Sequence, residues 1–173
     1  FNFHRVELDY REHIPITEGH TLSSHLRVGS ILGPPVPDFF DFYLVGLVGM
    51  KAYPFYAVSG NEIGWLNLTY RFPVWREMDV RLGHLYFDKL FFSVYGDIGN
   101  AWTGNIPSMS EFKKGAGFEV RLKMNSFYLF PTSIFFNAAY SFDEFTREVY
   151  GESIRYGKEW RLYGGILFDF NIY

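Results

Sequence analysis

Hydrophobic and polar residues alternate along most of the chain, and the alternation has a period of two. Between residues 112 and 125, the even positions are apolar apart from Lys114, whereas the odd positions are charged residues, glycines or an asparagine. A period of two is typical of a β-strand whose two faces meet different environments. The pattern predicts seven strands, near residues 3–11, 21–32, 64–72, 90–102, 112–125, 134–143 and 160–172. The segment Val80–Tyr86 is a candidate for an eighth strand.

The lengths and ends of these strands favour a membrane on the apolar side. A strand crosses a tilted bilayer with ~9–11 residues, and the longer predicted strands match that length. Aromatic residues gather near strand ends, as they do at the interfaces of outer-membrane barrels. They are Tyr70, Phe72, Trp102, Tyr140, Phe142, Trp160 and Tyr173. The alternation alone also fits a soluble lipid-binding barrel whose apolar face points inward.

Connections between the predicted strands alternate between long and short. The long ones cover residues 34–62, 103–113 and 144–159, and the short ones lie near 15–19 and 126–132. The segment 73–89 departs from this alternation, because it is long on the short side. Outer-membrane barrels have short turns at one end and longer extracellular loops at the other. We therefore predict an all-β fold, an antiparallel transmembrane β-barrel segment of about seven or eight meandering strands with one long extracellular loop.

Composition narrows the class further. The 173 residues suit one domain over 1–173, and an aromatic content of 21% excludes a disordered chain. The net charge of −3 means that the chain has no excess of positive charge with which to bind nucleic acid. The sequence has no cysteine, which excludes disulfides and thiolate chemistry. The longest nearly apolar run, 39–50, is shorter than the ~18 residues of a membrane helix. The first residue is Phe1 rather than methionine, which we interpret as a processed chain or a part of a longer protein.

The sequence contains no recognisable motif of catalytic or metal-binding residues. The five histidines do not have the spacing of a metal site such as His-Glu-x-x-His, and no glycine-rich phosphate loop is present. We therefore expect a protein that is not an enzyme and that has no metal and no cofactor.

The polar positions of the predicted strands would line a barrel lumen. They are Arg5, Glu7, Asp9, Arg27, Arg71, Glu119, Arg121, Lys123 and Asp169. Mixed signs suit ion-pair networks around an inserted loop and argue against a strongly selective pore, although any water-filled interior also needs polar side chains. Gly115, Gly117, Gly164 and Gly165 lie near strand starts, where glycine suits curvature, a bulge or the close approach of a plug. We favour curvature.

Three stretches carry a family resemblance. Tyr95-Gly96-Asp97-Ile98-Gly99, with Trp102 after it, has the form aromatic-x-Asp-x-Gly, Leu66–Pro73 ends in Arg-Phe-Pro, and Met50-Lys51-Ala52-Tyr53 lies in the longest loop. In this order they resemble the C-terminal barrel half of the BamA-type outer-membrane assembly and translocation superfamily, or bacterial surface antigen domain. The family has Val-Arg-Gly before the aromatic residue of its sixth extracellular loop, so Lys51 and Ala52 are departures. The likeness covers the chain as the last seven of sixteen strands, in the manner of barrels that follow TolB-like propeller repeats.

The resemblance implies a contact between the long loop and the lumen. Lys51 would take the place of the loop arginine and pair with Asp97, with Tyr53 and Tyr95 packed around the contact. A lysine makes a weaker clamp than arginine, because an ammonium group cannot form the bidentate fork. The lumen network would include Arg71, Glu119, Arg121 and Lys123. The terminal strand would form one side of the barrel seam, with Phe168, Phe170, Ile172 and the out-of-phase Tyr173.

These observations predict a non-enzymatic β-barrel component of the bacterial outer membrane, part of an assembly or translocation barrel with a lumen-inserted loop. The expected partners are outer-membrane lipid, further barrel strands from an N-terminal region or another chain, and client or complex subunits, but not nucleic acid. The alternative is a self-contained eight-stranded outer-membrane barrel that acts in surface binding or envelope stabilisation. Its additional strand would come from Val80–Tyr86.

Overall fold

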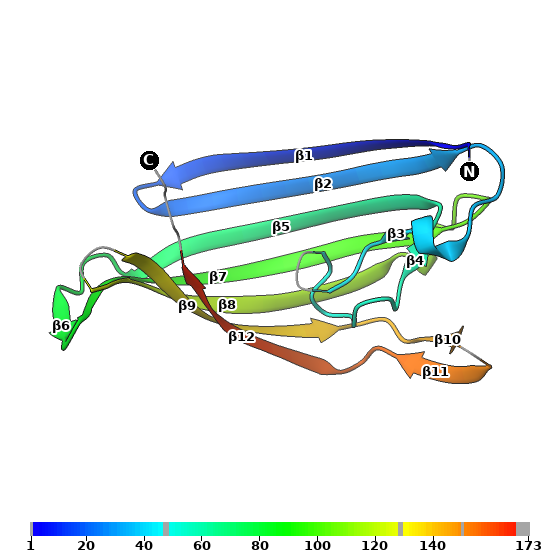
Figure 1. Ribbon diagram of the computed structural model, residues 1–173. Coiled ribbons are helices and arrows are strands. Elements are labelled where there is room, and N and C mark those ends of the chain that lie inside the picture. Colours follow the sequence, from blue (N-terminus) through cyan, green and yellow to red (C-terminus); the bar gives the residue numbers. More distant parts are fainter. Residues whose placement is uncertain (1, 47–48, 128–129, 150, 169–173) are drawn as a thin grey trace.

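Seven long strands form one antiparallel meander (Figure 1). The computed structural model describes residues 2–46, 49–127, 130–149 and 151–168. The long strands, in their spatial order, are β1 (His4–Thr17), β2 (His20–Leu32), β5 (Glu62–Trp75), β7 (Leu85–Trp102), β8 (Lys113–Ser126), β9 (Phe130–Ser141) and β12 (Trp160–Phe168). Each pairs with its neighbour along the chain, so the all-β antiparallel prediction and its seven strands are confirmed.

The candidate eighth strand is confirmed in place but is shorter than predicted. Only β6 (Val80–Leu82) forms there, and it folds back on the start of β7 as a small hairpin. Residues 85 and 86 already belong to β7, which has 18 residues. The positive φ of Gly83, +60°, permits the tight turn between β6 and β7. The long segment 73–89 therefore consists of the end of β5, this hairpin and the start of β7.

Neighbouring strands are in a register that keeps the even-numbered residues on one face. Leu26 lies opposite Leu66, Leu66 opposite Ile98, and Leu122 opposite both Leu90 and Ile134. We call this the outer face, and the face with the odd-numbered residues the inner face. A slip of one residue would move every side chain of a strand to the other face, so the shared alternation specifies the register.

Long and short connections separate to opposite ends of the sheet, as predicted (Figure 1). The short end has the β1–β2 turn and β6. The long end has three loops, which contain η1 (Asp38–Phe40), β3 (Phe42–Tyr43) with β4 (Ser59–Gly60), η2 (Met109–Glu111), and the hairpin of β10 (Phe145–Val149) with β11 (Glu152–Tyr156).

The sheet is open at β1 and β12 within the described residues. The path of paired strands runs from β1 to β12, and neither edge strand has a second neighbour there. All 14 residues of β1 are exposed. An eight-stranded closed barrel, the alternative drawn from the sequence, is not what the described chain forms.

Aromatic rings cross the outer face in a row. Tyr70 and Phe72 of β5, Phe92 of β7, Phe118 of β8 and Phe136 of β9 follow one another with centroid separations of 5.8, 5.5, 5.7 and 6.5 Å. Cross-strand aromatic contacts of this kind stabilise neighbouring strands by about 0.5–1 kcal/mol each. The row lies on the outer face of the sheet, so it is not part of the buried core.

The buried core lies on the inner face, where the connection from residue 33 to 61 packs against the sheet. We call this connection the inner loop. It supplies most of the hydrophobic residues of the buried core. They are Phe42, Leu44, Val45, Met50, Ala52, Tyr53, Ala57 and Val58. Two sheet glycines make the close approach of the loop possible. A Cβ on Gly29 would lie 2.7 Å from the Phe42 ring, and one on Gly115 would lie 2.6 Å from the Ala52 Cβ.

A methyl group at Gly115 is therefore expected to displace the inner loop. In Gly115→Ala the new carbon meets Ala52, whose Cβ is fixed to the backbone and cannot rotate away. We expect the loop to become susceptible to trypsin at Lys51. Gly96→Ala is the matched control, because a Cβ there meets nothing closer than 3.9 Å. Equal cleavage rates in the two variants would refute the role of Gly115, for which curvature alone was the interpretation favoured from the sequence.

Candidate functional site

The site where the inner loop meets the sheet involves strands β7, β8 and β12. Tyr53 is fully buried, and its hydroxyl donates toward the carbonyl oxygens of Lys114 at 2.9 Å and Asp143 at 3.2 Å. The same oxygen accepts a hydrogen bond from the Asp143 N–H at 3.3 Å. Burial raises the pKa of Tyr53 to about 12, so the hydroxyl keeps its proton at physiological pH. Tyr53 thus joins the loop to the start of β8 and to the segment after β9.

Lys51 makes three contacts with the sheet. Its Nζ lies 3.5 Å from Glu119 Oε2 and 4.8 Å from the centre of the Tyr95 ring. Its carbonyl oxygen accepts a hydrogen bond of 2.8 Å from the Tyr163 hydroxyl of β12. The insertion of Lys51 beside Tyr95 agrees with the loop contact that the resemblance implies.

The ion pair expected between Lys51 and Asp97 is not formed. Asp97 is buried, and its Oδ1 accepts hydrogen bonds from Trp65 Nε1 at 3.1 Å and Asn67 Nδ2 at 2.8 Å. Asn67 stands directly opposite Asp97 in the β5–β7 register, so neighbouring strands satisfy that oxygen without the loop. The other oxygen, Oδ2, is buried and has no hydrogen-bond partner among the described residues, while Lys51 pairs with Glu119.

Glu119 is the shared anion of the site. Its Oε1 lies 2.6 Å from Arg121 Nη2, while Oε2 faces Lys51. A buried carboxylate needs such partners, because an unpaired buried charge is strongly destabilising. The sequence placed Glu119 and Arg121 in the lumen network, and the structure confirms that these two residues interact.

Arg71 and Lys123, the other predicted lumen-network residues, form no ion pair with Glu119 or Arg121 among the described residues. Arg71 donates from Nε to Ser93 Oγ at 3.4 Å, and Lys123 lies over the Phe91 ring with its Nζ 5.4 Å from the centre. The Tyr95 hydroxyl donates to Asn137 Oδ1 at 2.8 Å. Sequence reasoning missed Trp65, Asn67, Asn137 and Tyr163 as partners. Their odd positions were the only signal, since the register that joins them is not visible in the sequence.

The terminal strand is described only in part. Phe168 is 55% exposed at the end of β12. The predicted seam residues Phe170, Ile172 and Tyr173 lie outside the described residues, as does Asp169. The β12 strand pairs with β9, from Trp160 opposite Tyr140 to Phe168 opposite Thr132.

The described residues contain no group of three or more His, Cys, Asp or Glu residues that could hold a metal ion. Within the same residues, no helix has the length and apolar character needed to cross a membrane. No family model, no curated protein and no solved structure matches the chain.

Proposed function

We propose that this chain is a non-enzymatic segment of a larger transmembrane β-barrel in the bacterial outer membrane, of the assembly or translocation type. The observation that carries the proposal is the contrast between the two faces of the sheet. The outer face is apolar and uncovered, whereas the inner face is polar and holds the inner loop.

The uncovered apolar residues occur on six of the seven long strands, β8 being the exception. Even-numbered side chains that are at least 41% exposed include Val6, Leu8, Val28, Leu68, Val94, Ile134, Phe136, Leu162 and Ile166. Soluble monomers rarely expose an apolar patch larger than a few hundred Å². Lipid is a solvent that suits such a face, and it requires the polar side chains to point inward. A soluble lipid-binding barrel is disfavoured, because the inner loop packs on the polar face.

The open edges indicate that further strands complete the sheet. Unpaired backbone groups in a bilayer cost several kcal/mol each, so β1 and β12 need partners there. Six antiparallel pairings separate β1 from β12, which means that the two edges run in the same direction. An odd number of added strands closes an entirely antiparallel barrel. A second copy of this seven-stranded sheet in the same orientation would instead create two parallel seams.

An assembly or translocation role agrees with the inner loop and the edges. The loop is held inside by Lys51 and Tyr53, and the face around it carries both signs of charge, which suits a plugged lumen better than a selective pore. An edge strand can template the strand of another protein by backbone hydrogen bonding. The resemblance noted from the sequence supports the same role.

Native mass spectrometry tests the proposal. The protein is extracted from outer membranes in mild detergent, and the mass of the intact particle is compared with the 20.3 kDa of this chain. We expect a heavier particle in which additional polypeptide, on the same or another chain, supplies the missing strands. A folded particle made of one or more copies of the 20.3 kDa chain alone would refute the larger barrel.

The assembly role has a test of its own. We expect depletion of the protein to lower the amounts of other outer-membrane proteins at constant transcript levels. Unchanged amounts of those proteins, with the larger barrel intact, would reject assembly or translocation and leave only the architecture.

A further inference from the structure

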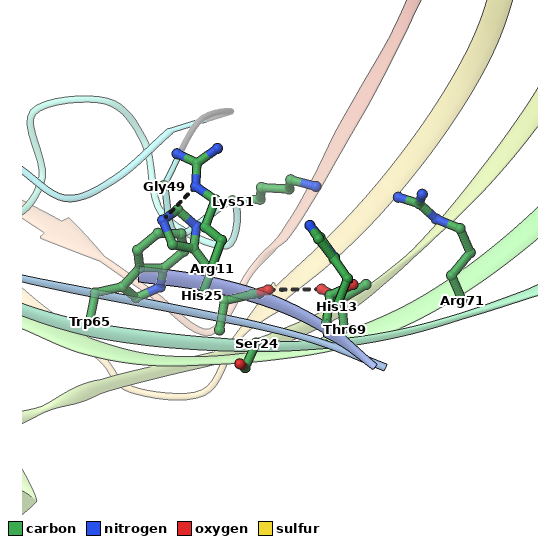
Figure 2. A pocket seen from close by; sticks show the side chains of 11 residues that line it. Arg11, His13, Ser24, His25, Gly49, Lys51, Trp65, Thr69 and Arg71 are labelled. Carbon is green, nitrogen blue, oxygen red and sulfur yellow. Dashed lines mark hydrogen bonds between the residues drawn. The ribbon is translucent and has the colours of Figure 1, made fainter. Parts of the chain in front are cut away.

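A polar cavity of about 380 Å³ lies on the inner face beside β1, β2 and β5. Figure 2 shows Arg11, His13, Lys51 and Arg71 on one side of the strands and Ser24 pointing to the other side. The lining residues are Arg11, His13, Ser23, Ser24, His25, Gly49, Lys51, Trp65, Asn67, Thr69 and Arg71. The lining contains three permanent cations and no carboxylate.

The cations at this cavity, which are Arg11, Lys51, Arg71 and the neighbouring Arg121, outnumber the three carboxylates that interact with them among the described residues, which are Asp9, Asp97 and Glu119. Arg11 Nε forms an ion pair with Asp9 Oδ1 at 2.9 Å. Lys51 Nζ lies 3.5 Å from Glu119 Oε2, but Glu119 also forms an ion pair with Arg121 through Oε1, at 2.6 Å. One carboxylate is therefore shared by two cations.

Arg71 forms no close ion pair among the described residues, although the charge of Glu119 acts on it. It is exposed on the inner face, and its one hydrogen bond goes from Nε to the Ser93 hydroxyl at 3.4 Å. The two terminal nitrogens have no hydrogen-bond partner in the part of the chain that the structure describes. A guanidinium whose two terminal nitrogens are free is well suited to an anion that accepts two parallel hydrogen bonds.

We propose that this cavity binds a small soluble molecule that carries a phosphate group. A phosphate dianion has oxygens on every side, so it can accept the fork of Arg71 while it neutralises the charge of Lys51. The volume exceeds that of one phosphate and lies within the range of small-molecule sites. The cavity and its charges belong to the inner face, so the inference does not depend on which solvent the outer face meets.

Isothermal titration of the detergent-extracted protein with inorganic pyrophosphate tests the proposal. We expect saturable binding that weakens at least tenfold in Arg71→Gln and in Lys51→Gln, because each variant removes a charge-assisted hydrogen bond. Arg71→Lys retains the charge and should recover part of the affinity. Arg76→Gln is the matched control, because Arg76 pairs with the exposed Glu18 on the β1–β2 turn, and it should bind like the unaltered protein.

Each other outcome overturns the inference. Absence of pyrophosphate binding by the unaltered particle would mean that the cavity is filled, for example by carboxylates of the completing strands. Equal affinity in Arg71→Gln and in the unaltered protein would place the anion elsewhere. The protein could instead bind phosphatidylglycerol in nanodiscs and fail to bind pyrophosphate in phosphatidylcholine nanodiscs. That result would identify a lipid headgroup, rather than a soluble phosphate, as the ligand.

Discussion

Tyr53→Ala is expected to release the inner loop from the sheet. The change removes a fully buried ring and the hydroxyl that joins the loop to the carbonyls of Lys114 and Asp143. Truncation of a buried aromatic side chain costs about 3–5 kcal/mol. Each 1.4 kcal/mol is a factor of ten, so the population of the released loop should rise about a hundredfold or more.

Trypsin measures this release at one position. Lys51 is the only lysine or arginine between residues 33 and 61, so cleavage after Lys51 reports exposure of the loop. The rate of appearance of a fragment that begins at Ala52 is followed by mass spectrometry on the membrane-inserted protein. Proteolysis follows the population of the open form when opening is fast.

Two further variants separate the ring from the hydroxyl of Tyr53. Tyr53→Phe keeps the ring and removes the hydrogen bonds, at about 1–2 kcal/mol, so cleavage should rise about tenfold. Tyr43→Phe removes a loop hydroxyl that donates to the Asp38 carbonyl at 2.9 Å nearer the loop surface, and it should change little. If Tyr53→Ala were cleaved no faster than Tyr43→Phe, the loop would not be held by Tyr53.

Glu119→Gln should destabilise the folded sheet by about 3 kcal/mol. The glutamine cannot neutralise Lys51 and Arg121, which then face each other across a buried position. Removal of one partner of a buried ion pair costs about 3–5 kcal/mol because it leaves an unpaired charge. The free energy of unfolding, from urea titration in lipid vesicles, measures the loss.

The double variant Lys51→Met with Glu119→Gln decides whether the two side chains act together. We expect it to lose less stability than the sum of the single losses, with a coupling of about 1–2 kcal/mol. Glu18→Gln, at an ion pair on the exposed turn, should change stability by less than about 0.5 kcal/mol. Strict additivity of the two single losses would show that the contact at 3.5 Å contributes nothing.

The sequence was sufficient for the strands, their faces and the order of the loops. The alternation of β8, where Phe118, Val120 and Leu122 are separated by Glu119 and Arg121, identifies both faces directly. The strand ends were less predictable. The segment Val80–Tyr86 reads as one strand, but Gly83 turns the chain within it and divides it between β6 and β7.

The contacts of the site were predictable only in part. The resemblance implies that Lys51 and Tyr53 lie in a barrel lumen, and the structure places both against the inner face of the sheet. The partner of Lys51 depends on which strand lies under the loop, and only Oδ1 of Asp97 has hydrogen-bond partners among the described residues, Trp65 and Asn67 from β5. Such cross-strand partners have no local spacing in the sequence, since more than 25 residues separate them from Asp97 along the chain.

A nitroxide scan tests most directly whether the outer face meets lipid. The chain contains no cysteine, so a single introduced cysteine carries the only label. Neighbouring positions on three strands provide matched pairs, which are Leu68 and Thr69, Ser93 and Val94, and Ser133 and Ile134. In the membrane-inserted protein, the even positions should collide more with oxygen than with a water-soluble nickel chelate, and the odd positions should not. Access of the nickel chelate to Leu68, Val94 and Ile134 would contradict a lipid-facing sheet.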